Sequence, residues 1–350
     1  MSARITLRDA SLCADSVQDG LILRLGDDHG RLGLGEAVAR PGFSPSLHAI
    51  GVSARASSLT TRMLGRSFAC AEEAAVLSAE LCDADGHNPL PSPLRFAIDS
   101  ALLDLLGRAR GCTVAALLGK PAPQIRRNAL VHIDTDRSAI QALQGRGFTT
   151  IKVKAHGPWP RSLHQLQTLA RMLAECSPTT RLRIDCNRSM PREGASKLLR
   201  GLAKLIPEYV EEPLEHLDPT TLRALLPADL ALAIDESAID RHAWCEHLDA
   251  GIATVAVIKP AFVGGLFAAR DRVEEARARG LKIVITSALE GSIGVAAAAH
   301  LALAIRPTLA VGISARTGTP LPPWLAADSP IVRHPASFGL GVDDPGGLDD

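Results

Sequence analysis

Short β-type runs alternate with helical patterns from residue 128 to residue 314 of this 350-residue chain. The runs are rich in Val, Ile and Leu, and the segments between them carry apolar residues at helical spacing. This alternation favours a parallel sheet, and eight units in so short a length favour closure into a barrel. An open doubly wound sheet fits less well, because no Gly-x-Gly-x-x-Gly turn follows the first run. The predicted strands are NALVHI, TTIKVKA, RLRIDC, EYVEEP, LALAID, TVAVIKP, KIVITS and LAVGIS.

The first 120 residues have a different pattern. Two strand-like segments, ARITLRDASL and GLILRLGDDHGRLGLGEA, precede a Gly/Pro-rich loop and three helical stretches over residues 45–64, 70–84 and 91–111. Strands followed by helices favour a small α+β unit, and Gly111 is a typical helix stop. We therefore predict an α+β unit over residues 1–120 and a barrel over residues 121–320. A C-terminal segment, residues 321–350, is predicted to pack back on the first unit or to fray.

Composition excludes several classes of partner. Lys plus Arg equals Asp plus Glu at 38 each, so net charge gives no case for a nucleic acid or a membrane surface. No apolar run approaches the roughly 18 residues of a membrane span. The seven cysteines are scattered without a Cys-x-x-Cys pair, and the N-terminus is polar, which predicts a cytoplasmic protein. A small anionic metabolite remains compatible with these numbers, and the oligomeric state is open.

Three carboxylates recur at equivalent points of consecutive predicted strands. Asp185 ends the third strand, Glu211 the fourth and Asp235 the fifth. Neighbouring strands lie about 5 Å apart, so these acids should converge at the carboxyl end of the barrel. Alone they would repel one another; with a cation they form the all-oxygen site that Mg²⁺ prefers. Taken singly, each acid could equally be a solvated strand end or a helix N-cap.

Two lysines alternate within the second predicted strand. Lys152 and Lys154 are two residues apart, so both side chains point to the same face. Lys259 ends the sixth strand, which faces the second across a barrel of eight. A lysine near another cation and a metal ion has a lowered pKa and can act as a base near neutral pH. One lysine of the pair is thus a candidate base, and the other holds it or the carboxylates in place. The alternative is a charged edge strand, which Ile151 and Val153 make less fitting.

This combination of residues resembles the enolase superfamily, muconate-lactonizing subgroup, over nearly the whole chain. The resemblance implies an α/β fold, a (β/α)7β-type modified TIM barrel with an N-terminal α+β capping domain that closes over its mouth. It implies that Lys154 and Lys259 flank the substrate and that Lys152 completes the catalytic set. It also implies Mg²⁺, with Mn²⁺ as a substitute, bound by Asp185, Glu211 and Asp235.

Within that superfamily the chain is most similar to o-succinylbenzoate synthases. GEAVARPGFSPS resembles their capping-domain loop, and ITSALEGSIG resembles their seventh-strand segment. Met190 departs from the family, which often has an aromatic residue there. Dipeptide epimerases usually show an Asp-x-Asp late in the barrel, and ISARTGTP lacks it. The substrate contacts that the resemblance implies are Phe43, Ser44, Arg183, Asn187, Gly264 and Ser287.

The activity that the resemblance implies is a Mg²⁺-dependent dehydration. The substrate would be 2-succinyl-6-hydroxy-2,4-cyclohexadiene-1-carboxylate and the product o-succinylbenzoate, a step of menaquinone biosynthesis and a lyase reaction. Racemisation of N-succinylamino acids, or epimerisation of dipeptides, is the alternative from the same superfamily. A noncatalytic barrel that binds a carboxylate ligand is a third hypothesis.

Overall fold

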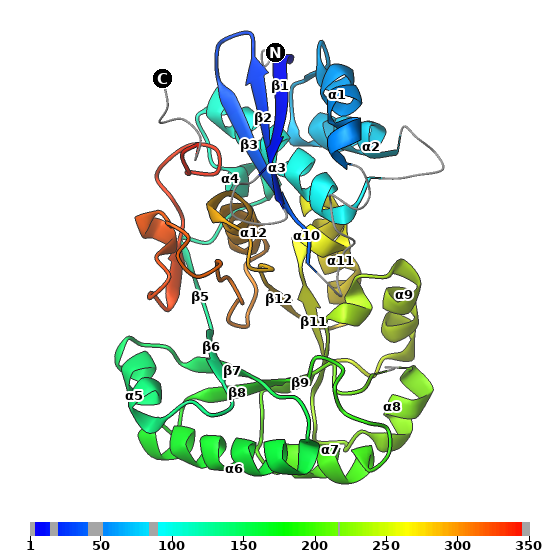
Figure 1. The fold of residues 1–350 in the computed structure, drawn as a ribbon, viewed down its shortest axis with the longest axis vertical. Helices are drawn as coiled ribbons and strands as arrows, with labels where there is room; N and C mark the ends of the chain where they lie inside the picture. The colour runs from blue at the N-terminus through cyan, green and yellow to red at the C-terminus, as the bar shows by residue number, and fades with distance from the viewer. Residues whose placement is uncertain (1–3, 15–19, 41–51, 84–89, 216–217, 345–350) are drawn as a thin grey trace.

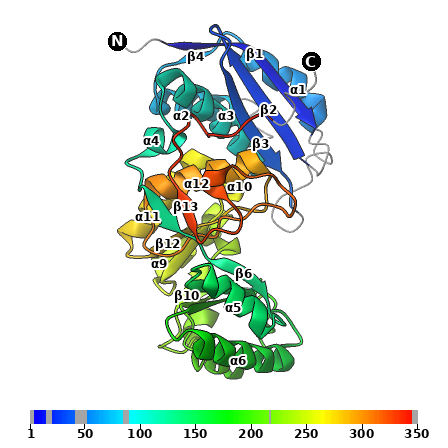
Figure 2. The ribbon, with the colours of Figure 1, turned by 90° about the vertical axis from the view of Figure 1, so that its left-hand side faces the viewer.

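The computed structural model describes residues 4–14, 20–40, 52–83, 90–215 and 218–344. Phe43 and Ser44 lie outside these residues. The ribbon shows an antiparallel N-terminal sheet standing over one end of a curled parallel sheet, whose far side is covered by helices (Figures 1 and 2). The predicted α/β barrel with an N-terminal α+β unit is confirmed.

Seven parallel strands form the curled sheet, in sequence order from β6 to β12. Parallel neighbours need a crossover connection, and helices between the strands supply it. The strands are β6 (Ala129–His132), β7 (Thr150–Lys154), β8 (Arg181–Asp185), β9 (Tyr209–Glu211), β10 (Leu232–Ile234), β11 (Val255–Ile258) and β12 (Lys282–Ile285). The connecting helices are α5 (Arg137–Gly145), α6 (Trp159–Cys176), α7 (Ala195–Ala203), α8 (Pro219–Leu225), α9 (Arg241–Ala250), α10 (Pro260–Val263), α11 (Leu266–Ala278) and α12 (Ser292–Ile305).

The eighth predicted run closes the barrel through isolated bridges and is not a regular strand. Val311 bridges Arg127 just before β6, and Gly312 bridges Thr286 just after β12, both in parallel. Backbone hydrogen bonds support both contacts, including Gly312 N–H to the Ile285 carbonyl at 2.9 Å. Only a short piece of LAVGIS therefore takes part in closure.

Alternate residues along the strands face opposite sides. One set packs outward on the helices within the main core, for example Ile151, Val153 and Ile184. The other set forms a separate apolar cluster inside the barrel, with Tyr209 and Val257 among its members. This period of two places Lys152, Lys154, Asp185 and Glu211 on the inner side, as predicted.

The N-terminal unit is a four-stranded antiparallel sheet with the order β3-β2-β1-β4. The second strand-like segment of the sequence splits at a turn closed by Gly30 N–H donating to the Asp27 carbonyl, and gives two strands. Gly35 lets β3 approach α3 closely, because a Cβ atom there would lie 1.9 Å from the Ala97 carbonyl oxygen. The elements are β1 (Ile5–Ala14), β2 (Gly20–Asp27), β3 (Leu32–Val38), α1 (Val52–Met63), β4 (Ser67–Phe68), α2 (Ala71–Asp83), α3 (Ser92–Arg110) and α4 (Val114–Leu118).

Two buried carboxylates of the N-terminal unit bond to the first turns of barrel helices. Glu36 on β3 accepts from Gly291 N–H at 2.6 Å and from Gly294 N–H at 2.8 Å, at the start of α12. Asp99 on α3 accepts from Phe267 N–H at 3.1 Å, at the start of α11. Helix N-termini present unpaired N–H groups and a positive dipole end, so a carboxylate is well matched to them.

The C-terminal residues contact both parts of the molecule. β13 (Ile331–Arg333), which follows the 3-10 turn Pro323–Leu325, pairs with β5 (Gln124–Arg126). Farther on, Asp344 forms an ion pair with Arg24 of β2 at 2.6 Å. The domain limits at residues 120 and 320 stay a prediction. Within the described residues, no helix has the length and apolar character to cross a membrane.

Candidate active site

The charged side chains inside the barrel come from neighbouring strands in register. Lys154 is aligned with Asp185, and Asp185 with Glu211, across β7, β8 and β9. Asp235 directly follows β10, and Lys259 directly follows β11. The carboxyl ends of five consecutive parallel strands thus deliver three acids and three lysines to one end of the barrel, the end where barrel enzymes carry their chemistry.

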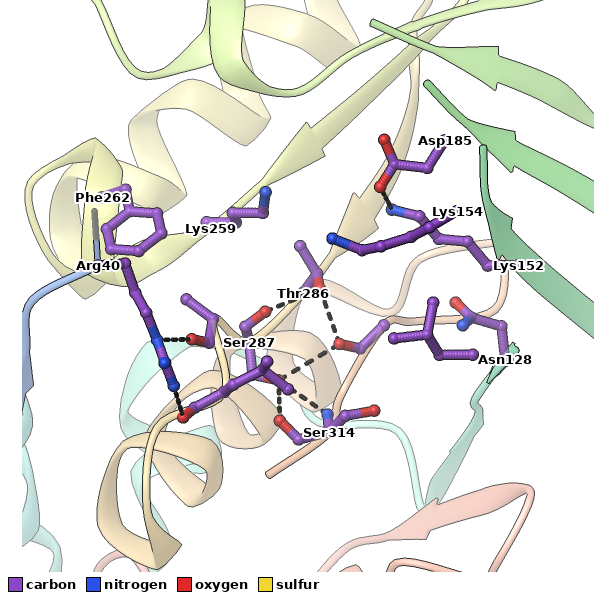
Figure 3. Close-up of a pocket in the computed structure, with 14 residues that line it drawn as sticks. Arg40, Asn128, Lys152, Lys154, Asp185, Lys259, Phe262, Thr286, Ser287 and Ser314 are labelled. Carbon is purple, nitrogen blue, oxygen red and sulfur yellow. Dashed lines mark hydrogen bonds and ion pairs between the residues drawn. The ribbon is translucent and has the colours of Figure 1, made fainter. Parts of the chain in front are cut away.

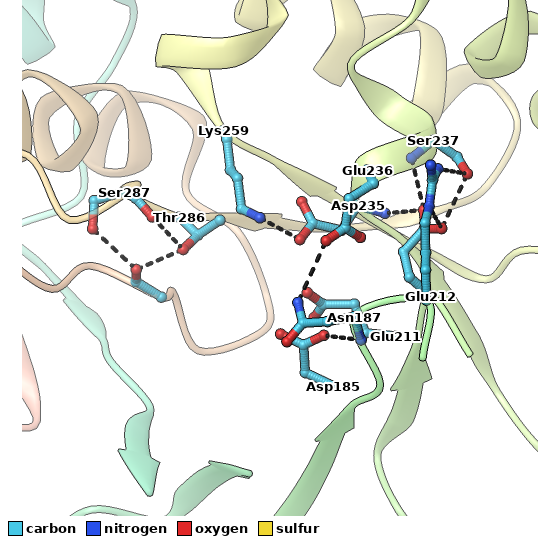
Figure 4. Close-up of polar contacts among 12 residues, drawn as sticks. Asp185, Asn187, Glu211, Glu212, Asp235, Glu236, Ser237, Lys259, Thr286 and Ser287 are labelled. Carbon is cyan, nitrogen blue, oxygen red and sulfur yellow. Dashed lines mark hydrogen bonds and ion pairs between the residues drawn. The ribbon is translucent and has the colours of Figure 1, made fainter. Parts of the chain in front are cut away.

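Each predicted metal ligand is bonded to a lysine. The Lys152 ammonium lies 2.7 Å from one Glu211 oxygen, 2.8 Å from the other, and 3.0 Å from an Asp185 oxygen. The Lys259 ammonium forms an ion pair with Asp235 (Figure 4). All three carboxylates are at most 1% exposed. Buried charges require such partners, because leaving water is costly for an isolated ion.

Burial and neighbouring charges shift the pKa values at this end of the barrel. Burial raises the pKa of Glu211 well above its usual value, and the Asp185 carboxylate adds to the effect. Burial alone would raise the pKa of Asp185, but Lys152 and Lys154 outweigh it and hold that pKa low.

The acids around Lys152 and Lys259 stabilise the charged form of both lysines. Burial opposes the charge on Lys152 and Lys259, yet Glu211 and Asp235 respectively outweigh it, and both pKa values are raised. These directions hold for the protein without a metal ion, and the lowered pKa expected for a lysine beside a bound metal ion stays a prediction.

The acids have the chemistry of a divalent-cation site. They supply only oxygen ligands, they are buried, and Oδ1 of Asp235 has no hydrogen-bond partner in the described structure. Among the described residues, no group of three Asp, Glu, His or Cys side chains is arranged to hold a metal ion as it stands. The lysine ammonium groups lie among the carboxylates. Asp185, Glu211 and Asp235 fit Mg²⁺ as the residues that would hold it.

Two further acids next to this cluster have different surroundings. Glu212 is fully buried, accepts from Asp235 N–H at 2.8 Å, and pairs with Arg188 at 3.0 Å. Glu236 lies beside Asn187, whose side-chain amide approaches it at 3.4 Å (Figure 4). Burial and the Asp235 carboxylate raise the pKa of Glu236 to about 7.

A cavity of about 170 Å³ opens beside the lysines and Asp185 (Figure 3). Its floor is polar, while its walls include apolar side chains from β6 and from the segments after β11 and β12. Such a mixture of apolar walls and a few converging polar groups is typical of a small-molecule site. The lining residues are Arg40, Asn128, Leu130, Lys152, Lys154, Asp185, Lys259, Phe262, Thr286, Ser287, Ala288, Leu289, Gly312 and Ser314.

Of the predicted substrate contacts that the structure describes, Ser287 lines this cavity. Its hydroxyl donates to the Ser314 carbonyl at 2.6 Å and accepts from Ser314 N–H at 2.7 Å, so it joins β12 to the closing segment. Asn187 instead donates its N–H to Asp185 at 3.0 Å. Gly264 ends α10 with φ of 109°. Neither Asn187 nor Gly264 is among the lining residues.

The structure corrects the prediction for Arg183. Its side chain is fully buried within the barrel, where it bonds to Glu208 at 2.6 Å, Asn128 at 3.1 Å and the Ala310 carbonyl at 2.7 Å. Its guanidinium also stacks 5.0 Å from the centre of the Tyr209 ring. Arg183 shares the inward face of β8 with Asp185 but lies two residues earlier on the strand, below the cavity.

Sequence reasoning missed several lining residues. Asn128 opens the first predicted strand, Thr286 is the last residue but one of the seventh and Ser314 ends the eighth, so the rule that polar strand ends line the site would have found the last two. Arg40 gives no such signal, because it belongs to a loop far from the barrel in sequence. Phe262, Leu130 and Leu289 have the apolar character of ordinary core residues.

Comparison with known proteins agrees with this geometry. A family model described as "Enolase C-terminal domain-like" matches residues 134–343, more than half of the chain. The chain belongs to this family. The match covers the strands that carry both the lysines and the acids.

Relatives within the family divide between two kinds of reaction at similar identity. An o-succinylbenzoate synthase of Desulfotalea psychrophila is 29% identical over 271 residues, covering 74% of this chain and 72% of the relative. An L-Ala-D/L-Glu epimerase of Francisella tularensis is 27% identical over 243 residues, covering 68% and 65%. The fold matches a dipeptide epimerase of Enterococcus faecalis, solved with Mg and L-Leu-L-Tyr, with a TM-score of 0.80, 20% identity and 97% of each chain covered. The chain is thus similar to enolase-superfamily enzymes of both reactions.

Proposed function

We propose that this protein is an o-succinylbenzoate synthase, a Mg²⁺-dependent lyase of menaquinone biosynthesis. One observation carries the choice of substrate. Among the described residues that line the cavity, three lysines (Lys152, Lys154 and Lys259) carry positive charge and Asp185 is the one acid; the guanidinium of Arg40 bonds instead to the backbone carbonyls of the wall. A wall with this charge suits a ligand that carries two carboxylates and no ammonium group. The cyclohexadiene substrate has both properties, whereas a dipeptide would bring an ammonium group against the cations.

The chain's own residues account for the proton chemistry. Lys154 would take the proton α to the ring carboxylate, and the electron pair left behind would delocalise into that carboxylate as an enediolate. Lys154 would then return the proton to the leaving hydroxyl, which departs as water. Lys259, across the cavity, would stabilise the developing negative charge as a cation. Mg²⁺, when bound by Asp185, Glu211 and Asp235, would supply further positive charge to the ring carboxylate.

Racemisation of N-succinylamino acids is the second candidate. Lys154 and Lys259 reach the cavity from separate strands, β7 and the end of β11, as an acid and a base on two faces of a substrate would require. The ligand would again be a dianion without a free ammonium group. A carboxylate-binding barrel without catalysis is the third candidate.

The test is an ultraviolet assay of the purified protein with Mg²⁺ and the cyclohexadiene substrate, with EDTA as the control. We expect metal-dependent loss of the diene absorbance. An inactive wild-type protein would overturn the proposal, and α-proton exchange of N-succinylamino acids in D₂O would then test the racemase.

The Lys154→Ala variant tests the assigned base. We expect its turnover to be lost while Mg²⁺ still raises its Tm, with the exposed Lys120→Ala as the matched control. Loss of the Mg²⁺ effect as well would show that Lys154 holds the metal site and that its assignment as base is wrong.

A further inference from the structure

The wall of the cavity includes a strained turn after β12. Leu289 has φ of +63°, in the left-handed region that a leucine rarely adopts. Its side chain is 42% exposed, yet it lines the cavity together with Leu130, which is 47% exposed. Strain that persists at a site requires surrounding contacts that enforce it, and it marks a candidate functional position.

The N-terminal unit supplies one of those contacts. Arg40 follows β3, and its Nε donates to the Ala288 carbonyl at 3.0 Å while its terminal amino group donates to the Leu289 carbonyl (Figure 3). A guanidinium presents donors in a fixed planar fork, so two successive carbonyls are held in one orientation. An ammonium group lacks this fixed geometry.

The barrel side of the same turn is fastened as well. Ala288 N–H donates to Oε2 of Glu290 at 2.6 Å, and the Glu290 side chain is 1% exposed. Glu36 bonds to Gly291 N–H, the next residue along. Thus Glu36 and Arg40, four residues apart at the end of β3, hold the turn from residue 288 to residue 291.

We propose that Arg40 is a positioning residue that sets substrate specificity by holding Leu289 on the cavity wall. With Leu289 in place, an apolar surface formed with Leu130 and Phe262 stands beside the cationic floor of Lys154 and Lys259. The cavity then selects dianions with an apolar ring or chain over small polar dicarboxylates. The choice of ring-bearing dianion rests on the proposed function, whereas the hold of Arg40 on the turn does not.

Hydrogen–deuterium exchange of the ligand-free protein tests the positioning step. Arg40→Ala should speed exchange of the backbone amides of residues 288–291, with Arg40→Lys intermediate. Arg8→Ala, which removes an exposed arginine from β1, is the matched control and should leave these amides unchanged. Unchanged exchange in Arg40→Ala would overturn the positioning role, whatever the enzyme's activity.

A double-mutant cycle tests specificity, with o-succinylbenzoate as the calorimetric probe in the presence of Mg²⁺. Arg40→Ala and Leu289→Ala should each weaken binding by roughly tenfold, and the double variant should bind no more weakly than Leu289→Ala. In turnover, Arg40→Ala should raise KM and leave kcat nearly unchanged. If the losses of affinity in the two single variants multiply in the double variant, then Arg40 acts on the ligand independently of Leu289, and the proposal is overturned.

Failure of the proposed enzymatic activity and failure of the proposed role of Arg40 give different results. A wild-type protein that binds the probe without converting its precursor would refute the proposed activity and leave the specificity cycle measurable. A wild-type protein that does not bind the probe would refute the ring-bearing dianion as ligand, and the exchange experiment would still decide whether Arg40 holds the turn.

Discussion

Lys152 reaches from β7 to the acids of the next two strands, with its ammonium 2.7 Å from Glu211 on β9. The same ammonium contacts Asp185 on β8. Its side chain is 14% exposed, and both carboxylates are buried, so this ion pair has little screening by water. In the metal-free protein Lys152 is therefore the main counter-charge for two of the three acids.

Lys152→Met should lower the stability of the metal-free protein by about 3–5 kcal/mol, the usual cost of removing one partner of a buried ion pair. Mg²⁺ should raise the Tm of the variant more than that of the wild type, because the carboxylates have lost their ammonium partner. Thermal unfolding with Mg²⁺ and with EDTA measures both effects, with Lys154→Met as the control on the exposed neighbouring lysine. Equal Mg²⁺ shifts in wild type and Lys152→Met would contradict this account.

Asp99 should make the protein less stable as pH rises from about 4 to about 7. Burial raises the pKa of Asp99 to about 7, against about 3.9 in an unfolded chain. Between these values the folded protein keeps a proton that the unfolded chain has released, so folding is favoured on the acid side. Asp99→Asn keeps a bond to Phe267 N–H and should flatten the fall in Tm over this range. A variant with the same pH profile as the wild type would refute the role of Asp99.

His300 should have the opposite effect on the acid side. Burial lowers its pKa to about 4, and its ring accepts from Ala115 N–H at 3.2 Å and pairs with the Leu340 carbonyl at 3.0 Å. Between about 4 and about 6.5 the unfolded chain binds a proton that the folded protein excludes, so stability falls as pH is lowered. The measurement is Tm against pH for wild type and His300→Gln, and the variant should lose stability less steeply below pH 6.5. If His300→Gln loses stability below pH 6.5 as steeply as the wild type does, another group causes the acid sensitivity.

Arg183→Met should destabilise the protein and leave substrate affinity intact. The change leaves Glu208 and the Ala310 carbonyl without a buried donor, a loss of several kcal/mol in the free energy of unfolding. Arg181→Met is a matched control, because Arg181 also bonds to Glu208, at 2.8 Å, from a side chain that is 65% exposed. Denaturant unfolding gives the stability, and KM of the folded protein gives the affinity. A large rise in KM at full stability would restore Arg183 as a substrate contact.

Much of the site follows from local periodicity. A strand presents alternate residues to opposite faces, so Lys152 with Lys154, and Arg183 with Asp185, had to share a face whatever the rest of the chain did. Parallel strands end at one edge, which brings Asp185, Glu211 and Asp235 to one end of the barrel. The alternation of strands and helices likewise predicted the barrel itself, because short apolar runs separated by helices have few other ways to bury both faces.

Other features depended on contacts between residues distant in sequence. Periodicity gives the face of a side chain but not its depth, and the register between β8 and β9 decided that Arg183 lies beside Tyr209 while Asp185 reaches Glu211. Loop conformation decided that Leu289 lines the cavity and that Arg40, about 250 residues earlier, holds it. The pairing of each acid with a lysine also depended on the tertiary structure, because it requires side chains from different strands to come together inside the closed barrel. The sequence alone determined the strand faces and the end of the barrel at which charge gathers, because these depend on near neighbours in the chain. Tertiary structure decided depth, pairing and the cavity wall, because these depend on strand register and on packing between segments far apart.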